Sequence, residues 1–212
     1  MNEKPDHEQE DNAGPSGREA LPPTAEGCQQ ELVSLLRKQP RGTANQSSPR
    51  VRALIEHLER ERPADLGRDG EWLPGVWELA WNDGNQPYLK VAPWLENLQI
   101  LDPQRGRGMN LLRLSGPLGA LAGIAVQAKI DVEGAQRVSV LFRRGGWLGP
   151  AWGSSRLQLL RDVKQSMPAW LDITVLDDEL RICRGNAGTL FALLRRRDVE
   201  IEELFPQDEH HS

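Results

Sequence analysis

Cysteine is scarce in this sequence: the 212 residues include two, Cys28 and Cys183. Two cysteines cannot form the disulfide framework that holds small secreted domains together. The first 27 residues carry seven acidic side chains and no apolar run, which argues against both a signal peptide and a transit peptide. We therefore expect an intracellular chain in which both thiols are reduced.

Histidine is also scarce, and three of the four histidines lie near the chain ends, as His7, His210 and His211. The fourth, His57, stands beside the apolar stripe of a predicted helix. Metal sites combine several histidine, cysteine or carboxylate ligands at characteristic spacings, and no such spacing occurs here. The sequence therefore predicts no metal site and no cofactor.

Long apolar runs are lacking as well. The longest, Leu118–Val126, has nine residues, about half of what a membrane-spanning helix needs. Glycine-rich stretches occur at Arg105–Gly108 and Gly185–Gly188, but neither follows a strand and opens a helix as a phosphate-binding loop does. No pair of titratable groups in a plausible pocket can be named. We expect a protein that does not cross a membrane and is not an enzyme.

Charge is unevenly placed along the chain. The formal net charge is -5, yet residues 28–197 hold 24 basic and 18 acidic side chains, a net charge of +6. The N-terminal segment, residues 1–27, combines four prolines with acids and glycines, a composition that cannot bury enough apolar surface to become ordered. We predict a disordered acidic tail over 1–27, one folded domain over 28–197 and an acidic C-terminal tail over 198–212. A basic domain can approach anionic lipid head groups or nucleic acid, but an excess of this size is typical of an ordinary solvated surface, and we expect no nucleic-acid partner.

Two amphipathic helices are predicted at the start of the folded domain, at about 29–39 and 49–62. Ser48 before Pro49 is a helix start signal, since a serine hydroxyl can cap a free backbone N–H and proline has none to satisfy. The apolar stripe of the second helix consists of Val51, Leu54, Ile55 and Leu58.

From Leu73 onward the apolar period changes from 3.6 residues to 2. The alternation is clearest in three segments, "GVWELAW", "IAVQAKIDV" and "RVSVLFRR". Strict alternation gives each strand one dry and one wet face, which suits an antiparallel sheet. About eight strands between 74 and 195, without further helices to cover a sheet, predict a barrel or strongly curled sheet. The two helices would pack against it or plug one end.

The segment 170–197 holds the residues that most resemble an active site: three adjacent acids beginning at Asp177, followed by Cys183. Consecutive strand residues point to opposite faces, so the acids cannot converge on one metal ion. The thiol has no evident base. We interpret the segment as three strands joined by two turns, with the acids at the first turn and Gly185–Gly188 at the second. The residues expected to share one face are Leu180, Ile182, Leu190 and Ala192.

Seven tryptophans are present, and two of them lie in a glycine-rich stretch flanked by arginines. Aromatic rings beside cations suit a membrane interface or the mouth of a ligand pocket. A core role, in which the rings anchor the loop, fits the sequence equally well. The candidate membrane-docking loop consists of Arg143, Arg144, Trp147, Trp152 and Arg156.

Several motifs, in order, resemble the plastid lipid-associated protein family, whose members are also called fibrillins. "LPGVWEL" resembles the family's first strand, and its Gly75-x-Trp77 is similar to the signature of lipocalins. "QRVSVLF" resembles a middle strand, and "WLDITVLDDELRICRGNAGTLFALLRR" resembles the C-terminal hairpins. The resemblance covers about residues 29–195. Trp81-Asn82 departs from the Tyr-Thr usual in the family at this place.

This resemblance implies a mainly β protein, an antiparallel lipocalin-like β-barrel of about eight strands preceded by two N-terminal helices. It implies binding or transport of an apolar small molecule (lipid, prenylquinone or carotenoid) at the thylakoid membrane or lipid bodies, with a role in photoprotection. Because the acidic N-terminus does not resemble a transit peptide, a cyanobacterial source is favoured, with the protein in the cytoplasm or peripheral on the thylakoid membrane. Arg181 is expected to cover Trp77, as an arginine does at the closed end of lipocalin barrels. The expected ligand-pocket or barrel-lining residues are Trp77, Leu79, Trp81, Ile124, Val126, Val138, Val140, Phe142 and Phe191.

Two interpretations of function remain open. A binder of an apolar molecule needs no polar motif, because each methylene that leaves water contributes about 0.8 kcal/mol. A structural protein that docks on membranes through Trp147, Trp152 and the neighbouring arginines, without a bound cargo, also fits the sequence.

Overall fold

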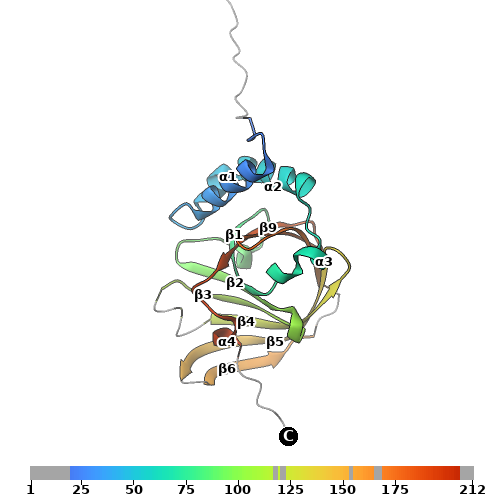
Figure 1. Ribbon diagram of the computed structural model, residues 1–212. Helices are drawn as coiled ribbons and strands as arrows, with labels where there is room; N and C mark the ends of the chain where they lie inside the picture. The colour runs from blue at the N-terminus through green and yellow to red at the C-terminus, as the bar shows by residue number, and fades with distance from the viewer. Residues whose placement is uncertain (1–19, 117–118, 120–122, 153–154, 165–168, 206–212) are drawn as a thin grey trace, which may run out of the picture.

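The computed structural model describes residues 20–116, 119, 123–152, 155–164 and 169–205, with backbone alone for 151–152 and 155–156. In this part of the chain, two long helices lie over a closed sheet (Figure 1). Most of the predicted N-terminal tail, residues 1–19, and the last seven residues, 206–212, lie outside the described residues.

The helical layer consists of α1 (Ala25–Arg37) and α2 (Ser48–Glu61), joined by the 3-10 helix η1 (Thr43–Ser47). The two long helices lie close to the predicted ranges 29–39 and 49–62. The side-chain oxygen of Thr24 accepts a hydrogen bond from the backbone N–H of Gly27 and so caps α1.

The prediction that Ser48 caps the second helix was wrong. Ser48 is the first residue inside α2, and its hydroxyl donates to the backbone oxygen of Asn45 at 2.9 Å. The same hydroxyl accepts a hydrogen bond from the indole N–H of Trp81 at 3.0 Å. Ser48 therefore ties the helical layer to the first strand of the sheet.

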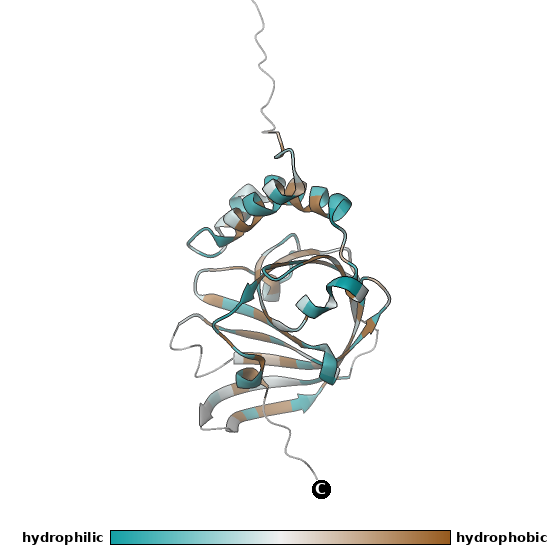
Figure 2. Ribbon diagram, viewed as in Figure 1, coloured by the Kyte–Doolittle hydropathy of each residue, from teal (hydrophilic) through white to brown (hydrophobic). Residues whose placement is uncertain are grey.

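Each long helix buries one face against the outside of the sheet. The predicted stripe of α2 is fully buried and packs with α1 in one apolar cluster. The strand residues predicted to share a face, Leu180, Ile182, Leu190 and Ala192, all belong to this cluster. Figure 2 shows the apolar sides of both helices turned toward the barrel.

The described strands form one antiparallel sheet. They are β1 (Gly75–Asn82), β2 (Leu95–Asp102), β3 (Arg107–Leu114), β4 (Gly123–Glu133), β5 (Arg137–Trp152), β6 (Ser155–Asp162), β7 (Ala169–Leu176), β8 (Leu180–Gly185) and β9 (Leu190–Arg196). Short 3-10 helices, η3 (Pro87–Leu89) and η4 (Pro103–Arg105), lie in the connections on either side of β2. Because β4 pairs with β5, β5 with β7 and β1 with β9, all strands except β6 close into a ring. The predicted barrel of about eight strands is confirmed.

A bulge between Leu79 and Trp81 changes the face on which β1 presents its side chains. Trp77 and Leu79 point into the barrel, whereas Trp81 lies in the cluster beneath the helices. A bulge adds one residue to a strand and so shifts the alternation of its side chains. The expectation that Trp81 lines the barrel does not hold for this reason.

One end of the barrel is closed by the segment between α2 and β1. This segment contains α3 (Leu66–Asp69) and the 3-10 helix η2 (Gly70–Trp72), and it lies in front of the opening of the ring in Figure 1. Leu66 and Leu73 pack in the interior with Trp77, whose indole N–H donates to the backbone oxygen of Leu73 at 3.1 Å. The interior is therefore sealed at this end by apolar side chains.

The helix α4 (Ile201–Leu204) lies within the stretch predicted as the C-terminal tail. Leu204 and Phe205 are buried in a third apolar cluster on the outer face of β1 to β4. Val199 and Ile201 of the same stretch also pack against this cluster.

Several ion pairs connect the helical layer to the barrel. Arg41, after α1, contacts the carboxylate of Glu78 on β1 at 2.6 Å. Glu59 of α2 accepts two hydrogen bonds from Arg184 of β8, at 2.9 and 2.6 Å. A bidentate pair of this kind fixes orientation as well as distance.

Substitution of a leucine in the helical layer tests the packing. Leu54→Ala should lower the free energy of unfolding in urea by about 3 kcal/mol, because Leu54 is fully buried and its truncation leaves a cavity. Leu159→Ala, at a position that is 71% exposed, should change it by less than about 0.5 kcal/mol. Equal effects of the two substitutions would contradict the packing of α2 on the sheet.

Candidate functional site

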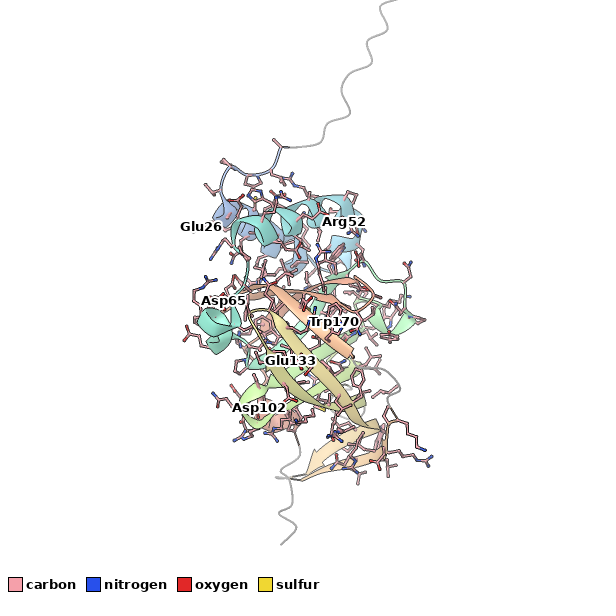
Figure 3. All side chains as sticks on the ribbon, turned by 90° about the vertical axis from the view of Figure 1, so that its right-hand side faces the viewer. Glu26, Arg52, Asp65, Asp102, Glu133 and Trp170 are labelled. Atoms are coloured by element: carbon pink, nitrogen blue, oxygen red, sulfur yellow. The ribbon has the colours of Figure 1, made fainter. Side chains whose placement is uncertain are left out.

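The barrel contains a cavity of about 250 Å³ between the sealed end and the opposite end. Its wall is mainly apolar and includes Leu101, Ala128, Ile130, Leu171 and Trp170. Trp170, at the start of β7, is labelled on the strand wall in Figure 3. The polar side chains on the wall are Tyr88, Gln99, Asn110 and Asn186. Tyr88, Asn110 and Asn186 are exposed, which places them at the mouth.

The volume of the cavity limits what it can hold. An engineered cavity of about 150 Å³ in another protein binds benzene, and pockets for drug-sized ligands span roughly 300–1,000 Å³. A volume of about 250 Å³ therefore suits a group of one or two rings or a short chain. The remainder of a longer molecule has to leave through the mouth.

The structure places the predicted lining residues in four settings. Four line the cavity: Val126, Val140, Phe142 and Phe191. Trp77, Leu79 and Val138 are buried in the barrel interior but away from the cavity wall. Trp81 lies outside, beneath the helices.

Ile124 does not line the barrel, because it is 62% exposed. It pairs with Trp147 in the half of β5 that leaves the ring to pair with β6. β4 therefore extends past the closed part of the barrel. Ala128 and Ile124 lie on the same face of β4, but the barrel encloses that face at Ala128 and leaves it open at Ile124.

A fully buried arginine lies behind the cavity wall. The guanidinium carbon of Arg181 is 5.2 Å from the ring centre of Trp77, within the range of a cation–π contact. The expectation that Arg181 covers Trp77 is confirmed. Arg195 lies over the same ring at 4.3 Å. Burial lowers the pKa of Arg181 to about 10, so it stays protonated near neutral pH.

Arg181 donates a hydrogen bond from Nη2 to the side-chain oxygen of Gln99, which lines the cavity. Its Nε and Nη1 atoms have no hydrogen-bond partner among the described residues. Sequence reasoning missed Gln99. Gln99 lies between Leu98 and Ile100 in β2, and alternation would assign these two apolar residues to the barrel interior and Gln99 to the outside. In the structure Leu98 and Ile100 face the α4 side instead, so Gln99 faces the interior.

The acids of the 170–197 segment form a turn. A side-chain oxygen of Asp177 accepts hydrogen bonds from the backbone N–H groups of Glu179 and Leu180, both at 2.8 Å. Its other oxygen accepts from Gln29 of α1 at 2.7 Å, and Glu179 pairs with Arg37. These contacts fit the predicted turn. Among the described residues, no group of three or more histidines, cysteines or acids is placed to hold a metal ion.

The predicted docking loop is in fact part of two strands. Trp147 is a half-buried residue of β5, while Arg143 and Arg144 beside it are exposed. Trp152 lies in β5 and Arg156 in β6, and their side chains are outside the described part.

Together with β4, these two strands present an open apolar face. Cross-strand pairing places Ile124, Trp147 and Leu159 in one row over β4, β5 and β6. Leu157 stands on the same side of β6 as Leu159. Ile124, Leu157 and Leu159 are 62%, 61% and 71% exposed. We call these four residues the apolar face; it belongs to the part of the sheet drawn below the ring in Figure 1.

A ring of eight antiparallel strands, sealed at one end over an arginine–tryptophan pair and hollow toward the other, defines a barrel of the lipocalin type. Residues 26–194 match the PAP_fibrillin family model, so the chain belongs to the fibrillin family. The resemblance seen in the sequence motifs is thereby confirmed.

Several relatives align with most of the chain. The light-induced protein, chloroplastic, of Solanum demissum is 26% identical, over 82% of this chain and 68% of its own length. The probable plastid-lipid-associated protein 2, chloroplastic, of Arabidopsis thaliana is 26% identical, over 80% and 71%. The chromoplast-specific carotenoid-associated protein of Cucumis sativus is 28% identical, over 67% and 58%. No solved structure matches the chain significantly.

The names of these relatives connect the family with plastids and with lipid or carotenoid association. In the described part of this chain, none of the helices combines the length and apolar character needed to span a bilayer.

Cys183 is fully buried in the barrel interior, and we assign it as a structural residue, which thiol reactivity tests. Burial raises its pKa to about 11, and burial likewise raises the pKa of Cys28. Because the thiolate is the reactive form, the native protein at pH 8 should react very slowly with Ellman's reagent, and two thiols should react at once in denaturant. Fast reaction of one thiol in the native protein would contradict the assignment.

Proposed function

We propose that this protein binds an apolar small molecule in the barrel cavity, without catalysing a reaction on it. The observation that carries the proposal is an interior space with a mainly apolar wall and a mouth at one end. A lipid, a prenylquinone or a carotenoid fits this chemistry, with one end enclosed. Relatives named for lipid and carotenoid association support the same class of ligand.

The energy available from the cavity is sufficient for specific binding. An enclosed group of about eight carbons gains roughly 6 kcal/mol before ordering costs, at about 0.8 kcal/mol per methylene. A long carotenoid cannot be enclosed in about 250 Å³, so its chain has to lie outside the mouth. We therefore propose binding or transport at the thylakoid membrane or at lipid bodies, where the protruding part stays in lipid, and through it a role in photoprotection.

Filling the cavity tests this function. Ala128→Leu should lower affinity at least tenfold, because Ala128 lines the cavity and the larger side chain occupies the ligand's volume. The matched control is Val132→Leu, four residues further along β4 at an exposed position, which should leave affinity unchanged. Titration with quinone and carotenoid analogues, beside lipid mass spectrometry of the purified protein, measures the effect. If the unaltered protein shows no saturable binding, the proposal is wrong.

A second candidate function, docking on a membrane surface without cargo, is favoured by the apolar face. Exposed leucines and isoleucine side by side on a sheet are uncommon on monomeric proteins and mark interaction surfaces. Exposed Arg143, Arg144 and Arg161 lie on the same strands. Arg161 pairs with Gly145, two residues before Trp147, and so stands on the side of the apolar face, whereas Arg144 stands on the other side. Apolar side chains beside a cation match a bilayer that carries anionic head groups.

Flotation with liposomes tests the docking surface. The double variant Leu157→Glu with Leu159→Glu should lose flotation, because carboxylates oppose burial in lipid. Leu141→Glu is the control, since Leu141 is 41% exposed but lies on β5 on the side opposite Val140 and Phe142. Binding should also weaken as salt screens the arginines. Equal flotation of all variants would exclude docking through the apolar face.

A further inference from the structure

Gln99 is the polar residue that stands between the cavity and the buried core of the barrel. It lies on β2 opposite Trp77 of β1, and it lines the cavity. Trp77 and Arg181, which are fully buried, are not part of the cavity wall. Among the other polar residues of the wall, Tyr88, Asn110 and Asn186 are exposed at the mouth. A ligand that enters the cavity therefore meets Gln99 at its enclosed end.

The orientation of the Gln99 amide is fixed by its partner. Arg181 donates to the Gln99 side-chain oxygen, and a guanidinium group has donors alone. The amide oxygen must face Arg181, because the reverse orientation would set donor against donor. The amide nitrogen, with two N–H donors, is then the group left for the cavity. No acceptor for it is found among the described residues.

The charge on Arg181 strengthens this donor. A cation bound to an amide oxygen polarises the amide, and hydrogen bonds in series reinforce one another in a medium of low dielectric constant. The donor is open to the cavity, where water can accept from it, but a hydrocarbon ligand excludes that water and leaves the donor without an acceptor, which is unfavourable. A ligand that supplies its own acceptor avoids this cost.

We propose that Gln99 is a specificity-determining residue, whose N–H donates to a carbonyl or other neutral acceptor oxygen at the enclosed end of the ligand. Arg181 acts as the positioning residue that holds the amide in this orientation. The barrel would then favour apolar molecules with a terminal carbonyl over hydrocarbons of the same shape. The inference rests on the proposed function of the cavity as a ligand site.

The test uses two small ligands of one shape, 1-tetralone and 1-methylenetetralin, in which a carbonyl oxygen is replaced by a methylene group. Affinities are measured by calorimetry for the unaltered protein and for Gln99→Glu. The carboxylate keeps an acceptor for Arg181 but offers no N–H. We expect the ratio of ketone to hydrocarbon affinity to fall roughly three- to tenfold in Gln99→Glu, the range for one neutral hydrogen bond.

Two further measurements keep the test decisive. Gln99→Leu should lower the ratio in the same direction and serves if Gln99→Glu does not fold. In the unaltered protein, the infrared carbonyl stretch of bound 1-tetralone should lie below its frequency in hexane, as a hydrogen-bonded carbonyl requires. A ratio unchanged by both substitutions, with an unshifted stretch, overturns the role of Gln99 while leaving the cavity a ligand site. If neither ligand binds, the proposed function fails and the inference with it.

Discussion

The buried guanidinium of Arg181 is the interaction on which the interior of this barrel depends. It lies on β8, over Trp77 of β1, and donates to Gln99 of β2, so one side chain connects three strands across the interior. Burying a cation is costly unless other groups compensate. Here a ring face and an amide oxygen supply part of that compensation, while Nε and Nη1 have no hydrogen-bond partner among the described residues. The segment around α3 covers the same end with apolar side chains. The sealed end, the orientation of Gln99 and the position of the cavity all follow from this placement.

The sheet carries buried clusters on both faces, and a bulge in β1 decides to which of them Trp81 belongs. Before the bulge, Trp77 and Leu79 fill the barrel; after it, Trp81 fills the contact with α1 and α2. A bulge leaves one residue unpaired and moves the side chains that follow it to the other face of the strand. The hydrogen bond from Trp81 to Ser48 then fixes the helical layer at that point.

Alternation predicted much of the fold and part of the site. The shared face of the β8–β9 hairpin and the positions of Val126, Val140 and Phe142 follow from a period of two, because each lies in a regular stretch of strand. The position of Trp81 could not be predicted, because a bulge does not change the apolar pattern of a strand whose two faces are both apolar. The prediction that Ile124 lines the barrel was wrong for a different reason. A period of two tells which face of a strand a residue lies on, but not how far along the strand the barrel encloses that face.

The two candidate functions need not compete, because the surfaces that carry them are continuous. Val126 lines the cavity, and Ile124, two residues earlier on the same face of β4, belongs to the apolar face. A molecule with one end in the cavity can therefore lay its remaining length along exposed apolar side chains rather than in water. If that face rests on lipid, the ligand passes between bilayer and barrel with little apolar surface exposed on the way. Since the cavity is too small for a long chain, such a continuous apolar path is what binding of a lipid or carotenoid by this barrel requires.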